Sequence, residues 1–177
     1  MATDIFIEPA LSFLAILNLF GTAQGVLLTL ALLSGKDAAR LPVRILAALT
    51  LTLSIIVSGA VLLSSKYVFV FPHLSRVHHP FVFLAGPLVY LYIRALTAPE
   101  KRFAKRDFLH FVPFALCLTY LLPYYFKSGA AKLQVLGSEY VQESFGNWYY
   151  FRSALFITQF LVYLVLIILT LIKYSQS

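Results

Sequence analysis

The stretch SALFITQFLVYLVLIILTLI, residues 153–172, decides the fold class of this chain. It runs for 20 residues without a charged side chain, between Arg152 and Lys173. An α-helix needs about 20 mainly apolar residues to cross the roughly 30 Å hydrocarbon core of a bilayer. A charge at the centre of such a helix would cost about 2.5–3.5 kcal/mol on the insertion scale. The stretch is therefore predicted to be a membrane-spanning helix.

Four more uncharged windows of similar length precede this stretch, at residues 9–35, 45–65, 77–93 and 108–126. They are apolar on every side, whereas the strands of a membrane barrel alternate apolar and polar residues. Because lipid offers the backbone no hydrogen bonds, a span that is not a barrel strand has to be a helix. We therefore predict an all-α fold, a single polytopic transmembrane bundle over residues 1–177. Its predicted spans are 9–33, 41–63, 80–96, 108–126 and 148–174.

The composition supports a membrane protein. Sixty per cent of the residues are apolar and 12% are charged, against about 45–50% and about 25% in soluble domains. The net charge is +7, but the lysines and arginines lie in short connections between apolar segments. That pattern is typical of membrane topology and is favoured over a nucleic-acid patch. A cleaved signal peptide is not expected, because residues 1–8 contain Asp4 and Glu8 but no basic residue.

Small and polar residues lie on one face of each of the first two predicted spans. Asn18, Gly21 and Gly25 share a face of the first span, and Ser54 and Ser58 share a face of the second. Gly21 and Gly25 form a GxxxG pair, which allows another helix to approach closely. We expect these faces to pack the two spans together, since the motif is common in bundles. The alternative is self-association of two copies through the Gly21/Gly25 face.

Three histidines, His73, His78 and His79, lie within seven residues of one another. Such a group can bind a metal ion, but no cysteine or carboxylate is near them in the sequence. We therefore interpret them as interfacial or capping residues and predict no metal and no cofactor. The sequence also contains no nucleophile–base pair and no phosphate-binding loop, so an enzyme is not expected.

Other polar and aromatic residues are interpreted by their position relative to the bilayer. The densest basic cluster, formed by Lys101, Arg102, Lys105 and Arg106, is predicted to fix topology and to contact anionic lipid headgroups. Arg152 is expected to extend to the interface, and the deeper Gln159 to hydrogen-bond inside the bundle. Aromatic residues at 124–126 and 148–151 are interpreted as an aromatic belt at one membrane face, in preference to a ligand pocket.

Four stretches carry a family resemblance: GTAQG at 21–25, PHL at 72–74, GPLVYLYIRALT at 86–97 and KRDFLHFVPF at 105–114. Together they resemble the N-terminal membrane domain of bacterial membrane-bound AraC-type transcriptional regulators. The resemblance covers roughly residues 10–174. It implies about seven spans followed by a cytoplasmic helix-turn-helix domain. Residues 1–177 contain only five predicted spans, so DNA is an expected partner only through a domain absent from this chain.

Three classes of function follow from these observations. The first is a non-catalytic sensory or anchoring domain of a transcriptional regulator in the bacterial inner membrane, in contact with the lipid bilayer. The second is a small transporter or channel subunit, and the third is an integral-membrane enzyme. If the domain senses a signal from outside, the longest connections, 66–79 and 127–147, are the expected contact surfaces.

The distribution of basic residues predicts the orientation. One side of the membrane holds nine of them, Lys36, Arg40, Arg44, Arg94, Lys101, Arg102, Lys105, Arg106 and Lys173. The other side holds five, Lys66, Arg76, Lys127, Lys132 and Arg152. An excess of lysine and arginine marks the cytoplasmic side. We therefore expect the N-terminus outside and the C-terminus in the cytoplasm.

This orientation can be tested with one introduced cysteine. In a variant that carries Val135→Cys and lacks Cys117, an impermeant maleimide should label residue 135 in intact cells, because the connection 127–147 faces outside. Labelling only after lysis would show that this connection faces the cytoplasm, opposite to the predicted orientation.

Overall fold

The computed structural model describes residues 8–98, 103–142 and 147–176. These residues form six α-helices and three 3₁₀ turns and contain no strand, which confirms the all-α prediction. The helices are α1 (Phe13–Ser34), α2 (Leu41–Ser64), α3 (His78–Thr97), α4 (Val112–Tyr125), α5 (Gly129–Gln142) and α6 (Asn147–Ser175). The 3₁₀ turns are η1 (Tyr67–Phe69), η2 (Pro72–Leu74) and η3 (Lys105–Phe111).

Five segments are long and apolar enough to cross a membrane. They are Phe13–Ser34, Leu41–Ser64, Pro72–Thr97, Lys105–Tyr125 and Tyr149–Ser175. The protein is therefore a multi-pass membrane protein. The first helix begins at Phe13, where the side chain of Ser12 accepts a hydrogen bond from the Ala15 N–H and caps the helix.

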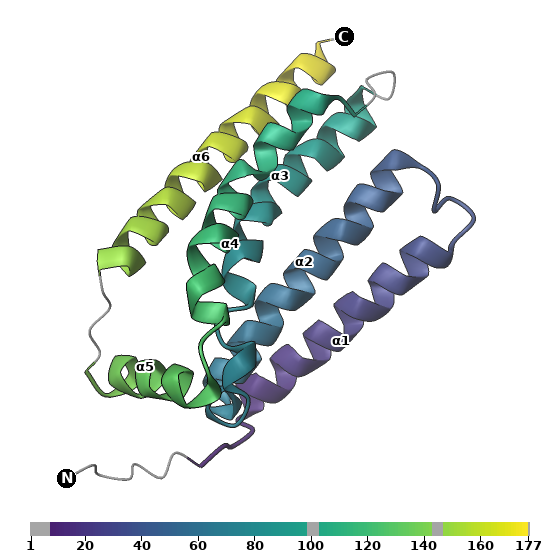
Figure 1. Ribbon diagram of the computed structural model, residues 1–177. Coiled ribbons are helices and arrows are strands. Elements are labelled where there is room, and N and C mark those ends of the chain that lie inside the picture. Colours follow the sequence, from purple (N-terminus) through teal and green to yellow (C-terminus); the bar gives the residue numbers. More distant parts are fainter. Residues whose placement is uncertain (1–7, 99–102, 143–146, 177) are drawn as a thin grey trace, which may run out of the picture.

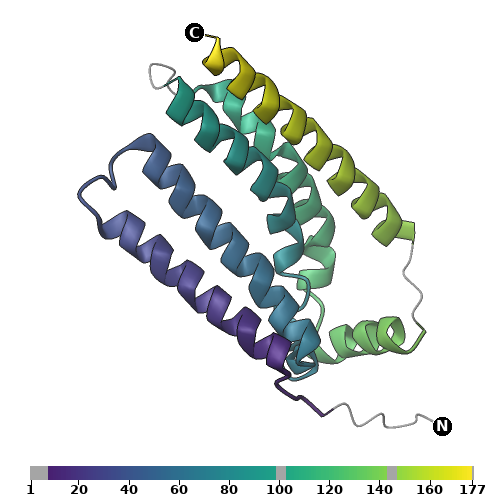
Figure 2. The same ribbon diagram turned by 180° about the vertical axis from the view of Figure 1, so that it is seen from behind.

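The five long helices run side by side, and α5 lies across one end of the bundle (Figure 1). The start of α1 and the end of α6 lie at opposite ends of the bundle, as the view from behind also shows (Figure 2). We name the ends of the bundle the α5 end and the C-terminal end. Helix α1 packs chiefly against α2, whereas α3 contacts α2, α4 and α6. Helix α3 is therefore the central helix.

Helices α1 and α2 meet through part of the small and polar faces predicted from the sequence, at Gly25 and Ser54. The hydroxyl groups of Thr29 and Thr50 lie 2.8 Å apart and hydrogen-bond across the interface. A Cβ atom added to Gly25 would lie 2.1 Å from the Oγ of Ser54, so only glycine allows this approach. Gly21, by contrast, is exposed and a Cβ added there would have no neighbour within 4 Å. The two glycines of the motif therefore face different surroundings.

The other predicted packing residues differ in burial. Ser54 is buried and its hydroxyl donates to the carbonyl of Thr50. Ser58 and Asn18 are half-buried. The Ser58 hydroxyl donates to the carbonyl of Ile55, within its own helix.

A proline inside α3 determines how α6 packs. Pro87 has no N–H, so it cannot donate to the carbonyl of Phe83, four residues earlier. The side chain of Gln159 on α6 donates to this carbonyl instead, at 2.9 Å. One turn further along, Tyr163 fits against Gly86, where an added Cβ would lie 3.0 Å from the Tyr163 ring. The prediction that Gln159 hydrogen-bonds inside the bundle is confirmed.

The two longest connections differ from the expectation. Tyr67, Phe69 and Phe71 alternate with valines, a pattern that suits an extended or interfacial segment, but the chain there is not extended and forms η1 and η2. The turns satisfy backbone groups that an isolated extended segment would leave unpaired; for example, the Val70 N–H donates to the Tyr67 carbonyl. Residues 133–141 of the connection 127–147 could form one or two helical turns by their sequence, and the structure has the longer, 14-residue helix α5 there.

The contrast between the two glycines gives a prediction. Gly25→Leu should lower the stability of the protein by about 1–3 kcal/mol, because the larger side chain would overpack the α1–α2 contact. The matched variant Gly21→Leu should leave stability unchanged. Both can be measured as the temperature at which the buried thiol of Cys117 becomes reactive to a fluorescent maleimide in detergent.

Equal losses in the two variants, or no loss in either, would contradict the packing described. Self-association through the Gly21/Gly25 face stays a prediction. It would appear as a smaller oligomer for Gly21→Leu at unchanged thermal stability.

Candidate functional site

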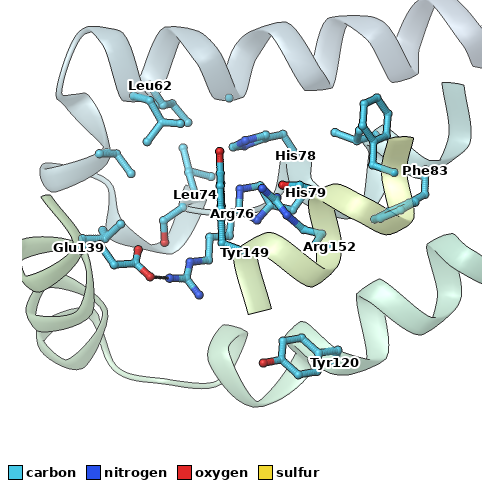
Figure 3. Close-up of a pocket in the computed structure, with 18 residues that line it drawn as sticks. Leu62, Leu74, Arg76, His78, His79, Phe83, Tyr120, Glu139, Tyr149 and Arg152 are labelled. Atoms are coloured by element: carbon cyan, nitrogen blue, oxygen red, sulfur yellow. Dashed lines mark hydrogen bonds and ion pairs between the residues drawn. The ribbon is translucent and has the colours of Figure 1, made fainter. Parts of the chain in front are cut away.

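A cavity of about 520 Å³ opens at the α5 end of the bundle. Its size is within the range of about 300–1,000 Å³ typical of small-molecule pockets. Figure 3 shows how side chains from several segments surround it. The residues that matter below are Arg76 after η2, His78, His79 and Phe83 on α3, Glu139 on α5, and Tyr149, Arg152, Ser153 and Phe156 on α6. The cavity therefore lies where both long connections meet the ends of the spans.

Basic side chains outnumber carboxylates among the described residues that line this cavity. Arg76, Arg152, His78 and His79 line it, with Glu139 as the one carboxylate of the described lining. That carboxylate already forms an ion pair with Arg76. The guanidinium of Arg152 lies 5.5 Å from the centre of the Tyr149 ring, but it forms no ion pair with any residue that the structure describes.

Arg76 has a structural role in the wall of the cavity. Its backbone is left-handed, with φ 62°, which turns the chain from η2 into α3. The guanidinium lies 4.3 Å from the centre of the Tyr124 ring and pairs with Glu139 on α5. Its carbonyl accepts a hydrogen bond of 3.1 Å from the hydroxyl of Tyr125. Arg76 therefore joins the start of α3 to α4 and α5.

A buried lysine fixes α5 to the bundle. Only 1% of Lys132 is exposed. Its ammonium group donates to the carbonyl of Tyr125 at 2.9 Å and lies 3.1 Å from the Nδ1 atom of His73. Since an ammonium group has no acceptor, His73 accepts this bond. Helix α5, which contributes Glu139 to the cavity, is therefore held to the bundle by two basic residues, its own Lys132 and Arg76 of the turn before α3.

The histidines separate into two groups. His73 bonds Lys132, whereas His78 and His79 line the cavity with their ring centres 4.5 Å apart. His78 fits against Gly59 of α2, where an added Cβ would lie 2.1 Å from the His78 ring. Within residues 8–98, 103–142 and 147–176, no group of three or more His, Cys, Asp and Glu side chains could hold a metal ion.

The aromatic belt expected at this end is divided between lipid and protein. Phe126, Tyr150 and Phe151 are exposed, as a belt requires. Tyr124 instead is buried, and its hydroxyl lies 2.7 Å from that of Ser75. Tyr149 lines the cavity. The side chain of Trp148 lies outside what the structure describes. Some of these aromatic residues are therefore exposed as in a belt, and others are buried or line the cavity.

The C-terminal end contains the most deeply buried ion pair of the described residues. The two terminal nitrogens of the Arg94 guanidinium, Nη1 and Nη2, donate to the Asp107 carboxylate at 2.7 and 2.6 Å, and Asp107 is only 2% exposed. The Ala104 N–H also donates to this carboxylate, at 2.8 Å. The pair joins the last turn of α3 to η3. Next to it, His110 of η3 bonds the hydroxyl of Tyr163 on α6 at 2.8 Å.

Sequence analysis did not identify this pair, although its two members lie in the last two stretches that carry the family resemblance. The predicted basic cluster lies beside it. Lys105 and Arg106 are exposed, as lipid-headgroup contacts require, while Lys101 and Arg102 lie outside the described residues. Comparisons of the chain with protein-family models, with curated proteins and with solved structures found no match in any of the three.

The contrast between buried and exposed ion pairs gives a prediction. Arg94→Gln should cost about 3–5 kcal/mol of stability, because it leaves the buried Asp107 carboxylate without its cation. Arg40→Gln is the matched control, since Arg40 and its partner Asp37 are 73% and 60% exposed. It should cost less than about 1 kcal/mol.

The double variant Arg94→Leu, Asp107→Leu should be more stable than Arg94→Gln, since it leaves no unpaired charge. The temperature of Cys117 labelling measures all three variants. A loss for Arg94→Gln no larger than that for Arg40→Gln would show that the pair does not hold α3 to η3.

Proposed function

We propose that this chain is the membrane-embedded sensory and anchoring part of a bacterial transcriptional regulator, with a non-catalytic role. The observation that carries the proposal is the cavity at the α5 end. It is formed by both long connections and by the ends of α2, α3 and α6. A ligand bound there would touch several spans at once. Its binding energy could therefore bias how these spans pack, which is what transmission of a signal along a bundle requires.

The positions of the charged residues support a sensor over a proton-coupled transporter. Such a transporter needs ionisable side chains near the bilayer midplane. Among the described residues of the five spans, Arg94, Asp107 and Arg152 lie near helix ends. The alternative, a small transporter or channel subunit, rests on Pro87 in α3, since interrupted helices are typical of transport sites. The carbonyl freed by Pro87 is already bonded by Gln159.

We also propose the orientation and location of the protein. The connection between α1 and α2, the turn η3 and the C-terminus lie at the same end of the bundle (Figure 1). These segments carry Lys36, Arg40, Lys105, Arg106 and Lys173. By the positive-inside rule, this end lies on the cytoplasmic side of a bacterial inner membrane and the cavity lies on the outer side. A DNA-binding domain that followed α6 would then face the chromosome.

The proposal can be tested in the bacterium that encodes the chain, by comparing transcripts of four strains: wild type, a gene deletion, Ser153→Leu and Ala154→Leu. Ser153 lines the cavity, so leucine there should fill it. Ala154, the next residue, is exposed on the outside of α6 and serves as the matched control. Both variant proteins should accumulate in the membrane at the wild-type level.

We expect the deletion to change a defined set of transcripts. Ser153→Leu should make the same set unresponsive to growth conditions, and Ala154→Leu should behave as wild type. If no transcript depends on the gene, the chain is not part of a regulator. If transcripts depend on the gene but not on Ser153, the cavity is not the sensory site.

A further inference from the structure

We propose that the cavity binds an amphipathic anion, a carboxylate or phosphate head group attached to a short hydrocarbon chain. This inference rests on the proposed sensory function and names the class of ligand. The first argument is charge. Arg152 faces the cavity and forms no ion pair within the described parts of the chain, and the carboxylate of Glu139 is already paired with Arg76. A partly buried guanidinium is stabilised by an oxyanion, to which it can donate two parallel hydrogen bonds.

The second argument is the depth of the cavity in the membrane. The uncharged run 153–172 measures about 30 Å as a helix, which is the thickness of the hydrocarbon core. Arg152 immediately precedes this run, so it lies at the boundary between head groups and hydrocarbon. Tyr149 lies one turn before Arg152, on the head-group side, and Phe156 lies one turn after it, on the hydrocarbon side. The cavity therefore crosses this boundary.

The third argument is the distribution of the lining residues. Figure 3 shows Arg76, Arg152, His78 and His79 close together in the middle of the cavity, with Phe83 to one side of them. Phe83 packs edge-on against Phe156, with ring centres 6.4 Å apart. A ligand whose head group bonds Arg152 can extend its hydrocarbon chain along Phe156, which is 37% exposed, and along the half-buried Leu62 and Val82. A purely polar anion would leave these apolar side chains uncovered. A purely apolar ligand would leave Arg152 without an ion-pair partner among the described residues.

The test uses the purified chain in an uncharged detergent, with the temperature of Cys117 labelling as the measure of unfolding. The probes are decanoate and decyl phosphate, with decanol as the matched neutral probe and decyltrimethylammonium as the cationic one. A ligand that binds only the folded protein raises its unfolding temperature. We expect decanoate and decyl phosphate to raise it by a few degrees in a saturable manner, and the other two probes to leave it unchanged.

Variants then locate the binding site. Arg152→Gln should weaken decanoate binding by at least about tenfold, and Ser153→Leu should weaken it by filling the cavity. Arg106→Gln and Ala154→Leu are the matched controls, because Arg106 is exposed at the opposite end and Ala154 faces outward. Both controls should bind decanoate as wild type does. An equal response to decanol and decanoate, or unchanged binding by Arg152→Gln, would overturn the proposal.

A final arm distinguishes the source of the anion. Phosphatidylglycerol added to the detergent should compete with decanoate in wild type if the natural ligand is a lipid of the bilayer. If it does not compete, the ligand is a free amphiphile; both results agree with an amphipathic anion. The proposed ligand class and the proposed regulatory function can also fail independently of each other. A transcript response that depends on Ser153 without decanoate binding would overturn only the ligand class. Decanoate binding without any regulated transcript would overturn only the proposed role in a transcriptional regulator.

Discussion

Hydrocarbon offers no hydrogen-bond partner to a polar group, and the packing of this bundle follows from that constraint. Pro87 frees the carbonyl of Phe83 inside α3, and Gln159 of α6 donates to it. Thr29 and Thr50 bond each other between α1 and α2. The buried carboxylate of Asp107 bonds Arg94. In each case the polar group is satisfied from another segment, so the requirement that keeps it from lipid also determines which segments are neighbours.

The sequence was sufficient for the features that depend on local composition. A charge-free run such as 153–172 identifies a span by its length alone, and Gln159 in such a run has to find a partner inside the protein. The features that were missed depend on contacts across the chain. Lys132 looked like an ordinary charged residue of a polar connection, yet it is buried, because the Tyr125 carbonyl and the His73 ring accept hydrogen bonds from its ammonium group. The alternation at 67–71 suits an extended segment, and the turns that form there could not be predicted, because their hydrogen bonds leave no periodic pattern in the sequence.

The site was predicted only in outline. The two long connections were expected to carry contacts, and both contribute to the cavity. The position of Arg152 beside an apolar run suggested a side chain that extends to the interface, and sequence alone could not show that it lines a cavity together with residues of α3 and α5. The two ends of the bundle consequently differ in character. The C-terminal end has a complete ion pair, Arg94 with Asp107, whereas the described lining of the cavity at the α5 end has more cations than carboxylates.

The bond between Gln159 and Phe83 also constrains the order in which the protein can be assembled. Helices α1 and α2 are adjacent in the chain and pack against each other, so this hairpin can form while the ribosome is still translating the later spans. The Phe83 carbonyl of α3 has no donor at that stage, because Gln159, which donates to it, lies 76 residues further along the chain. Until α6 enters the bilayer, this carbonyl has to be shielded by water, by lipid head groups or by the insertion machinery. Correct assembly of the centre of the bundle is therefore a late event in biosynthesis, and α6 is the span that completes it.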